Sequence, residues 1–167
     1  EFHADCRKMA PVERTNWLNH HLNEMARIVI KYGGTRDKYI GDEVMVFFGD
    51  PTSRGPIQHA IQCVKMAQEM IFRTKIMGLD IRIGINSGNV ILGNLGSEKH
   101  RLEYAMIGDN VNIGQRLESS APTQGCMISL STYELVKDFV KVGEMQEIEV
   151  KGKKEPVKSS VVQGLKS

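Results

Sequence analysis

The sequence is poor in cysteine and has no long apolar run. Its three cysteines, Cys6, Cys63 and Cys126, are an odd number at wide spacings, so they form neither a disulfide framework nor a metal-binding pattern. No stretch approaches the roughly 18 apolar residues of a membrane span, and no signal peptide is visible. Because the chain begins at Glu1 without Met, we expect a piece of a longer protein. We expect it to be cytoplasmic, either free or tethered to the membrane by an upstream segment.

An excess of charge of one sign is also lacking. The 22 basic and 20 acidic residues give a net charge of +2, which is too small to favour nucleic acid as a partner. The one local basic run, Lys151 to Lys154, is interpreted as a solvated turn, and the five histidines show no ligand spacing. With 41% hydrophobic and 25% charged residues, the 167 residues suit one globular domain that covers residues 1–167.

The hydrophobic periodicity alternates between helical and strand-like segments. A helix is predicted from Pro11 to Tyr32, and a hairpin follows with Gly41-Asp42-Glu43 as its turn. A second helix is predicted at 56–75, with Ile57 among its inward residues and with Met66 and Met70 as core filler. The further predicted strands are 79–85, 89–93, 104–107, 126–131, 140–150 and 157–162, and the further helices are 109–119 and 132–138. This order predicts an α+β fold, an antiparallel-rich sheet with helices packed on one face.

Glycines recur at positions 84, 88, 93 and 96 without a nucleotide-binding pattern. Their spacing matches neither the dinucleotide fingerprint nor the phosphate loop of the Walker type. They are therefore interpreted as turn residues of a hairpin between two short strands.

The most informative segment is Tyr104 to Leu117. A short apolar strand leads through a Gly-Asp turn into a helix, for which Asp109 or Asn110 is the expected N-cap. Asn112 and Arg116 are four residues apart on that helix and so share one face. An amide and a guanidinium near a helix start suit a phosphate that gains charge during a reaction. Taken alone, the pair more often represents a surface arginine bonded to a neighbouring asparagine.

A second cluster is the segment Lys38-Tyr-Ile-Gly-Asp42. Asp42 at a hairpin tip is free to bind a hard cation such as Mg²⁺, which accepts one or two carboxylates together with phosphate oxygens. The alternative is a turn aspartate that accepts hydrogen bonds from backbone N–H groups. Lys38 alone is compatible with a solvated surface lysine.

Four motifs in this order resemble a known family. Lys38-Tyr-Ile-Gly-Asp42, Ile81-Arg-Ile-Gly-Ile-Asn-Ser-Gly88, Val111-Asn-Ile-Gly-Gln-Arg-Leu117 and Val150-Lys-Gly152 resemble the catalytic domain of class III nucleotidyl cyclases. These adenylate and guanylate cyclases convert a nucleoside triphosphate to a 3′,5′-cyclic monophosphate and pyrophosphate. The resemblance is greatest to the bacterial homodimeric type, and it implies a ferredoxin-like, palm-type sheet.

The resemblance implies a role for each matching residue. Asp42 would bind metal, and Lys38 and position 105 would read the base. Asn112 would orient the ribose, Arg116 would stabilise the α-phosphate, and Lys151 would hold the terminal phosphates. Phe2 and His3 match a turn whose backbone touches phosphates. The resemblance also implies two Mg²⁺ or Mn²⁺ ions per site, with each site shared across a head-to-tail homodimer.

The chain departs from the family pattern at two places. The second metal-binding aspartate and the first strand of the sheet are expected upstream of Glu1, outside this chain. At the second base-reading position stands Ala105, where adenylate cyclases usually place Asp or Thr and guanylate cyclases Cys or another small polar residue. Ala105 cannot accept a hydrogen bond with its side chain, whereas Lys38 is typical of enzymes that use ATP.

These observations favour an adenylate cyclase that acts on ATP as a homodimer, fused upstream to a sensor or membrane segment. A guanylate cyclase and a catalytically silent module that binds nucleotide or a partner are the alternatives. A diguanylate cyclase is disfavoured: Gly41-Asp42-Glu43-Val44 is similar to its hairpin, but Ile40 replaces the first glycine of that motif. That family also does not explain Asn112 and Arg116.

Overall fold

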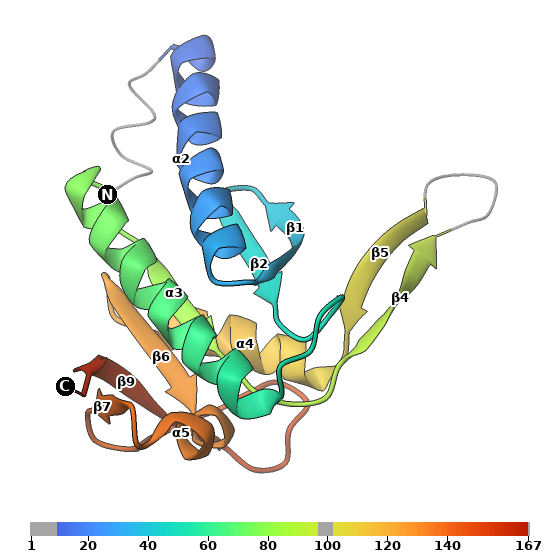
Figure 1. Ribbon diagram of the computed structural model, residues 1–167, viewed down its shortest axis with the longest axis vertical. Coiled ribbons are helices and arrows are strands. Elements are labelled where there is room, and N and C mark those ends of the chain that lie inside the picture. Colours follow the sequence, from blue (N-terminus) through green and yellow to red (C-terminus); the bar gives the residue numbers. More distant parts are fainter. Residues whose placement is uncertain (1–9, 97–101, 167) are drawn as a thin grey trace.

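The computed structural model describes residues 10–96 and 102–166, and in these ranges it contains four helices and nine strands (Figure 1). Their order agrees with the α+β prediction. The helices are α2 (Pro11–Lys31), α3 (Pro56–Ile76), α4 (Asp109–Ser120) and α5 (Leu130–Val136). The strands are β1 (Thr35–Ile40), β2 (Glu43–Phe47), β3 (Arg82–Ile85), β4 (Ile91–Gly96), β5 (Leu102–Ile107), β6 (Gly125–Ser129), β7 (Val140–Val142), β8 (Gln146–Ile148) and β9 (Val157–Leu165).

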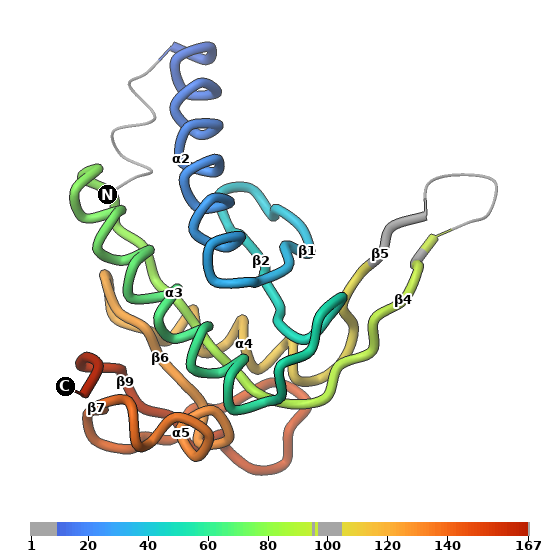
Figure 2. The backbone as a smooth tube through the Cα atoms, viewed as in Figure 1, coloured from blue at the N-terminus to red at the C-terminus, as the bar shows by residue number. Residues whose placement is uncertain are grey.

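The described strands form three sheets. The largest has the order β3-β6-β9-β7, and β8 also pairs with β9; only the β3–β6 pair in it is parallel. β1 and β2 form one antiparallel hairpin, and β4 and β5 form another. The β4–β5 hairpin projects away from the body of the domain (Figure 2). The prediction of an antiparallel-rich α+β fold is therefore confirmed.

The helices cover both faces of the largest sheet, which corrects the prediction of a single helical face. Alternate residues of β6 show this directly. Cys126 and Ile128 pack in one cluster with α3 and with Val136 of α5, whereas Met127 packs with Ile113 and Leu117 of α4 on the opposite face. Successive side chains of a strand point to opposite faces, so α4 lies alone across the sheet from α3 and α5.

A third apolar cluster joins α2 to α3 and to the β1–β2 hairpin. Met66 and Met70 are buried there against Met25, Ile28 and Val29 of α2, so their prediction as core residues is confirmed. Full burial of one such side chain contributes about 1.5–3 kcal/mol. Ile57, predicted to point inward, is 52% exposed; it lies in the first turn of α3, and the burial of the helix begins one turn later at Ala60 and Ile61.

Gly84 and Gly93 lie inside strands, so their prediction as turn residues is wrong. β3 pairs in parallel with β6 rather than forming a hairpin with β4. A Cβ atom at Gly84 would lie 2.2 Å from the backbone nitrogen of Glu118 and 2.3 Å from the carbonyl oxygen of Gly114. The glycine is therefore required by the close approach of β3 to the backbone of α4, and not by a turn.

The two described cysteines, Cys63 and Cys126, are free thiols in the core. Burial raises the pKa of Cys63 to about 12, and burial next to Cys63 raises the pKa of Cys126 as well. Neither thiol is therefore activated as a nucleophile. Within the described ranges, no helix combines the length and the apolar character needed to cross a membrane.

Candidate active site

The start of α4 is held by the loop that follows β3. Gly108, with φ of +141°, is the N-cap, so the prediction of Asp109 or Asn110 in that position is wrong. Asn110 instead fixes the loop: its Nδ2 donates to the Asn89 carbonyl at 2.8 Å, and its Oδ1 accepts from Asn86 Nδ2 at 3.0 Å. These bonds attach the first turn of the helix, and the residues it carries, to the end of β3.

Asn112 and Arg116 lie on the exposed side of α4, while Ile113 and Leu117 anchor the helix in the core. The Nε–H of Arg116 donates to the carbonyl oxygen of Glu149 at 2.9 Å. Arginine has five N–H donors, so this bond orients the guanidinium while its terminal nitrogens stay available to a ligand. Arg116 thus connects α4 to the segment that leads into Lys151.

Lys151 lies in a tight turn beside the start of α4. Gly152 has φ of +87°, and the N–H of Lys153 donates to the Val150 carbonyl at 3.0 Å. The ammonium of Lys153 lies 3.6 Å from the Asp109 carboxylate, which ties the turn to the helix. Between them is a hollow of about 30 Å³ lined by Asp109, Asn112, Val150, Lys151, Gly152 and Lys153. The structure therefore brings the predicted residues Asn112 and Lys151 together.

The two predicted base-reading positions lie on strands that contact each other. Lys38 is on β1, with 42% of its side chain exposed, and Ala105 is on β5, buried to 5% exposure. Asp37 connects them, because its carboxylate accepts from the Met106 N–H at 3.3 Å and lies 3.6 Å from the Lys38 ammonium.

Asp42 lies in the β1–β2 turn, exposed, after Gly41 with φ of +64°. Burial raises the pKa of neighbouring Glu43, and the charges of Glu118 and Asp42 add to that shift. Burial lowers the pKa of His21 on α2, and the charge of Asp42 opposes that shift.

An exposed carboxylate fits a cation that takes one or two carboxylates and completes its shell with phosphate oxygens. The described residues contain no group of three His, Cys, Asp or Glu side chains that could hold a metal by themselves. Asp42 also does not line the hollow formed by Asn112 and Lys151. Phe2 and His3 lie outside the described residues.

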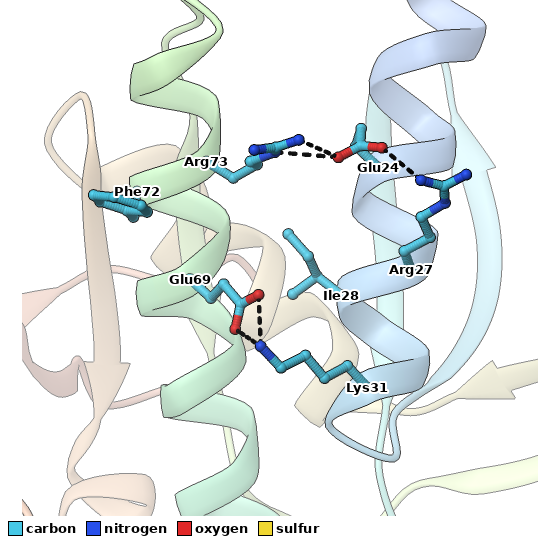
Figure 3. Close-up of a pocket in the computed structure, with 7 residues that line it drawn as sticks. All are labelled: Glu24, Arg27, Ile28, Lys31, Glu69, Phe72 and Arg73. Atoms are coloured by element: carbon cyan, nitrogen blue, oxygen red, sulfur yellow. Dashed lines mark hydrogen bonds and ion pairs between the residues drawn. The ribbon is translucent and has the colours of Figure 1, made fainter.

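A larger cavity of about 480 Å³ lies between α2 and α3, where cross-helix ion pairs join Arg73 to Glu24 at 3.0 Å and Lys31 to Glu69 at 2.7 Å (Figure 3). The hydrogen bond from Lys31 lowers the pKa of Glu69 and raises that of Lys31. These charges are already paired with one another. Among the described residues, every charged side chain that lines the cavity is therefore already committed to an ion pair and is not free to bind a ligand.

The hollow at the start of α4 is lined by the Asn112 amide, the ammonium groups of Lys151 and Lys153, and the Asp109 carboxylate that pairs with Lys153. Arg116 lies farther along α4, outside this lining, and is bonded to the segment that leads into Lys151. The amide and the ammonium groups are donors of the kind that bind the oxygens of an anion. The fold and the site together define an α+β domain with a cluster of amide and basic side chains at the start of α4.

Comparisons with known proteins agree with this class. The family model described as the adenylate and guanylate cyclase catalytic domain matches residues 1–163. The chain belongs to this family of nucleotidyl cyclase catalytic domains.

Two solved structures share its fold across nearly the whole chain. The adenylyl cyclase CyaB from P. aeruginosa is 38% identical with a TM-score of 0.90, covering 96% of this chain and 87% of that one. The guanylate cyclase domain of RhGC from Catenaria anguillulae, in complex with GTP, is 28% identical with a TM-score of 0.88, covering 99% and 92%.

Among the curated relatives, an adenylate cyclase of Anabaena cylindrica is 34% identical over 138 residues. The match covers 78% of this chain and 27% of that relative, and other curated matches are covered to a similar or smaller share. The relatives include adenylate and guanylate cyclases. Membership of the family thus defines a nucleotidyl cyclase domain, and it is compatible with either nucleotide.

Sequence reasoning missed two contributors to these sites. Lys153 belongs to the basic run that was interpreted as a solvated turn, and its pairing with Asp109 depends on how β8 and β9 place that turn. Asp37 precedes Lys38 in the printed sequence, but its burial follows from an irregularity in strand pairing that has no signal in the residue pattern.

Proposed function

We propose that this domain is an adenylate cyclase, which converts ATP to 3′,5′-cyclic AMP and pyrophosphate as a homodimer. The observation that carries the proposal is that the Lys151 turn lies beside Asn112 at the start of α4, while Arg116 of the same helix is bonded to Glu149, which leads into that turn. Phosphoryl chemistry asks the protein mainly for positioning and charge stabilisation, and these residues are suited to both.

In the proposed reaction the ribose 3′-oxygen attacks the α-phosphorus, and the bond from that phosphorus to the β-phosphate bridge breaks. The 3′-hydroxyl gives its proton to solvent water, and pyrophosphate leaves with the electron pair of the broken bond. Asn112 holds the ribose in line for attack. The free terminal nitrogens of Arg116 donate to the α-phosphate oxygens as they gain charge, and Lys151 binds the leaving phosphates.

Domains of this family generally use divalent metal ions, and we propose two Mg²⁺ or Mn²⁺ ions per site. Asp42 would hold part of that pair, together with a carboxylate from upstream of Glu1. Such ions lower the pKa of the attacking hydroxyl and neutralise phosphate oxygens.

A second copy of the chain is proposed to complete each site, because Asp42 does not line the hollow at α4. The two hairpins that carry the base-reading positions keep Ile40, Ile91 and Ile107 exposed, at 45%, 70% and 39%. Exposed apolar side chains on adjoining elements suit a surface that a partner covers. The partner's Asp42 would then face Asn112 and Arg116 of this chain.

We expect the full-length protein to form cyclic AMP from ATP when Mg²⁺ or Mn²⁺ is supplied, and to release one pyrophosphate per turnover. Chromatography of the products after incubation with ATP or with GTP measures this. If cyclic GMP forms faster than cyclic AMP, the substrate is GTP and not ATP. If neither product forms, the hypothesis of an active cyclase is wrong, and the alternative of a catalytically silent module that binds nucleotide takes its place.

Lys38→Glu is expected to raise the KM for ATP and to lower kcat/KM for ATP at least tenfold. The proposed partner of the Lys38 ammonium is a hydrogen-bond acceptor nitrogen of the adenine base, and a carboxylate in the same place repels that nitrogen. Because the Lys38 ammonium lies 3.6 Å from the buried Asp37 carboxylate, the variant is expected to melt below the wild type, and the kinetics are compared at a temperature where both proteins are folded. Lys65→Glu, at an exposed position of α3, is the matched control. Unchanged ATP kinetics in Lys38→Glu would remove Lys38 from base recognition.

A further inference from the structure

Asp37 occupies an irregular position in β1. The pairing with β2 runs from Arg36 opposite Val46 directly to Lys38 opposite Met45, so Asp37 has no partner residue in the ladder. An extra residue of this kind bends the strand and changes the direction of its side chain. β-bulges are frequent next to active sites for this reason, and this one immediately precedes Lys38.

The side chain that the bulge redirects is a buried carboxylate. Only 1% of the Asp37 side chain is exposed. Its Oδ1 accepts from the Met106 N–H, and its Oδ2 lies 3.6 Å from the Lys38 ammonium. This Oδ2 accepts no hydrogen bond from the part of the chain that the structure describes. A buried carboxylate is costly unless it is paired, so an apolar residue would serve better here if the position only filled space.

The two partners of Asp37 belong to the two base-reading positions. One is Lys38 itself, and the other is the peptide that joins Ala105 to Met106 on β5. These residues lie on different hairpins in different sheets. The Asp37 carboxylate thus joins the two hairpins that carry the predicted base-reading positions.

We propose that Asp37 is a positioning residue for base selection, which orients the Lys38 ammonium and fixes β5 at Ala105 relative to it. The inference rests on the proposed function. Lysine has a flexible stem, so an ammonium held near a buried counter-charge samples fewer positions than a free one. Since Ala105 has no polar side chain, discrimination between bases depends on how accurately Lys38 and the β5 backbone are placed.

The test is a double-mutant cycle in the full-length protein. Asp37→Asn keeps the shape and an acceptor for the Met106 N–H but removes the charge beside Lys38. We expect it to weaken the preference between ATP and GTP, measured as the ratio of their kcat/KM values, by about tenfold, as a coupled contact of this kind produces. The change should lie mainly in KM. Asp138→Asn, an exposed aspartate after α5, is the matched control and should leave the ratio unchanged.

The second arm combines Asp37→Asn with Lys38→Met. If Asp37 acts through Lys38, Asp37→Asn has little further effect on the ratio in the Lys38→Met background. An equal effect in both backgrounds, or no effect in either, overturns the proposal. Thermal melting identifies a variant that does not fold, and Asp37→Ser then replaces Asp37→Asn with the same expected ratio.

Calorimetric titration with ATP and with GTP separates this inference from the proposed function. If the wild-type protein binds one nucleotide in preference to the other but does not turn it over, the proposed enzymatic function is wrong. The role of Asp37 can still be tested in that case, because the binding preference must weaken in Asp37→Asn. A wild-type protein that binds neither nucleotide overturns both the function and the role of Asp37.

Discussion

Arg116→Ala is expected to lower kcat for cyclic AMP formation by a hundredfold or more while the protein stays folded. Loss of a donor that acts in the transition state typically costs about 3 kcal/mol. The side chain is exposed, and its hydrogen bond reaches a carbonyl of the exposed residue Glu149, which water can satisfy instead. Initial rates at saturating ATP, together with the melting temperature, measure the two expectations.

Two further variants sharpen this result. Arg116→Lys keeps the charge but loses the planar donor set, so we expect it to recover only part of the rate. Arg54→Ala, at an exposed position before α3, should leave kcat unchanged. If Arg116→Ala raises KM and leaves kcat unchanged, Arg116 contributes to ground-state binding alone, and its proposed role at the α-phosphate is wrong.

Mixing Asp42→Ala chains with Arg116→Ala chains tests whether the site is shared. Each homodimer of a single variant should be inactive, because both of its sites lack one half. A heterodimer has one site with both halves intact, so random pairing should restore about a quarter of wild-type activity. Mixtures no more active than the separate variants would place Asp42 and Arg116 of one chain in the same site.

Much of the fold was accessible from the sequence because local pattern and tertiary environment agree there. α2 begins at Pro11, as predicted, and Met25, Ile28 and Val29 of its apolar stripe are buried. Strand partners were less accessible. The segment 86–88 resembles a hairpin turn, but it leads from a strand of one sheet to a strand of another. Its polar residues serve α4 instead, through the bonds between Asn86 and Asn110.

In the candidate site, too, some features were predictable from the sequence and others were not. Asn112 and Arg116 share a helix, so their spacing alone places them on one side of it. The approach of Lys151 depends on the long-range pairing of β8 with β9 and on the carbonyl of Glu149, which no residue pattern encodes. The burial of Asp37 depends on a bulge of one residue. Contacts within one element were predictable, whereas contacts that need two elements in register were not.

Gly84→Ala is expected to destabilise the domain by about 3 kcal/mol or more, at the upper end of the cost of overpacking. The added Cβ would meet backbone atoms of Glu118 and Gly114 at 2.2 and 2.3 Å, and backbone cannot rotate away as a side chain can. For a domain of this size, the corresponding fall in melting temperature is about 10 °C. Activity should fall as well, because any shift of α4 moves Asn112 and Arg116. Thermal unfolding followed by circular dichroism measures the first effect.

Gly114→Ala is the matched control, since Gly114 lies on α4 beside Gly84 but its own Cβ would meet nothing within 4 Å. An alanine in a helix is favoured over glycine by about 0.5–1 kcal/mol, so this variant should melt at or above the wild-type temperature. The two substitutions add the same methyl group on either side of one contact, and they should shift stability in opposite directions. A Gly84→Ala protein as stable as Gly114→Ala would mean that β3 and α4 do not approach closely. The restraint that holds Asn112 and Arg116 in place would then have to come from the Asn110 bonds and from the burial of Ile113 and Leu117.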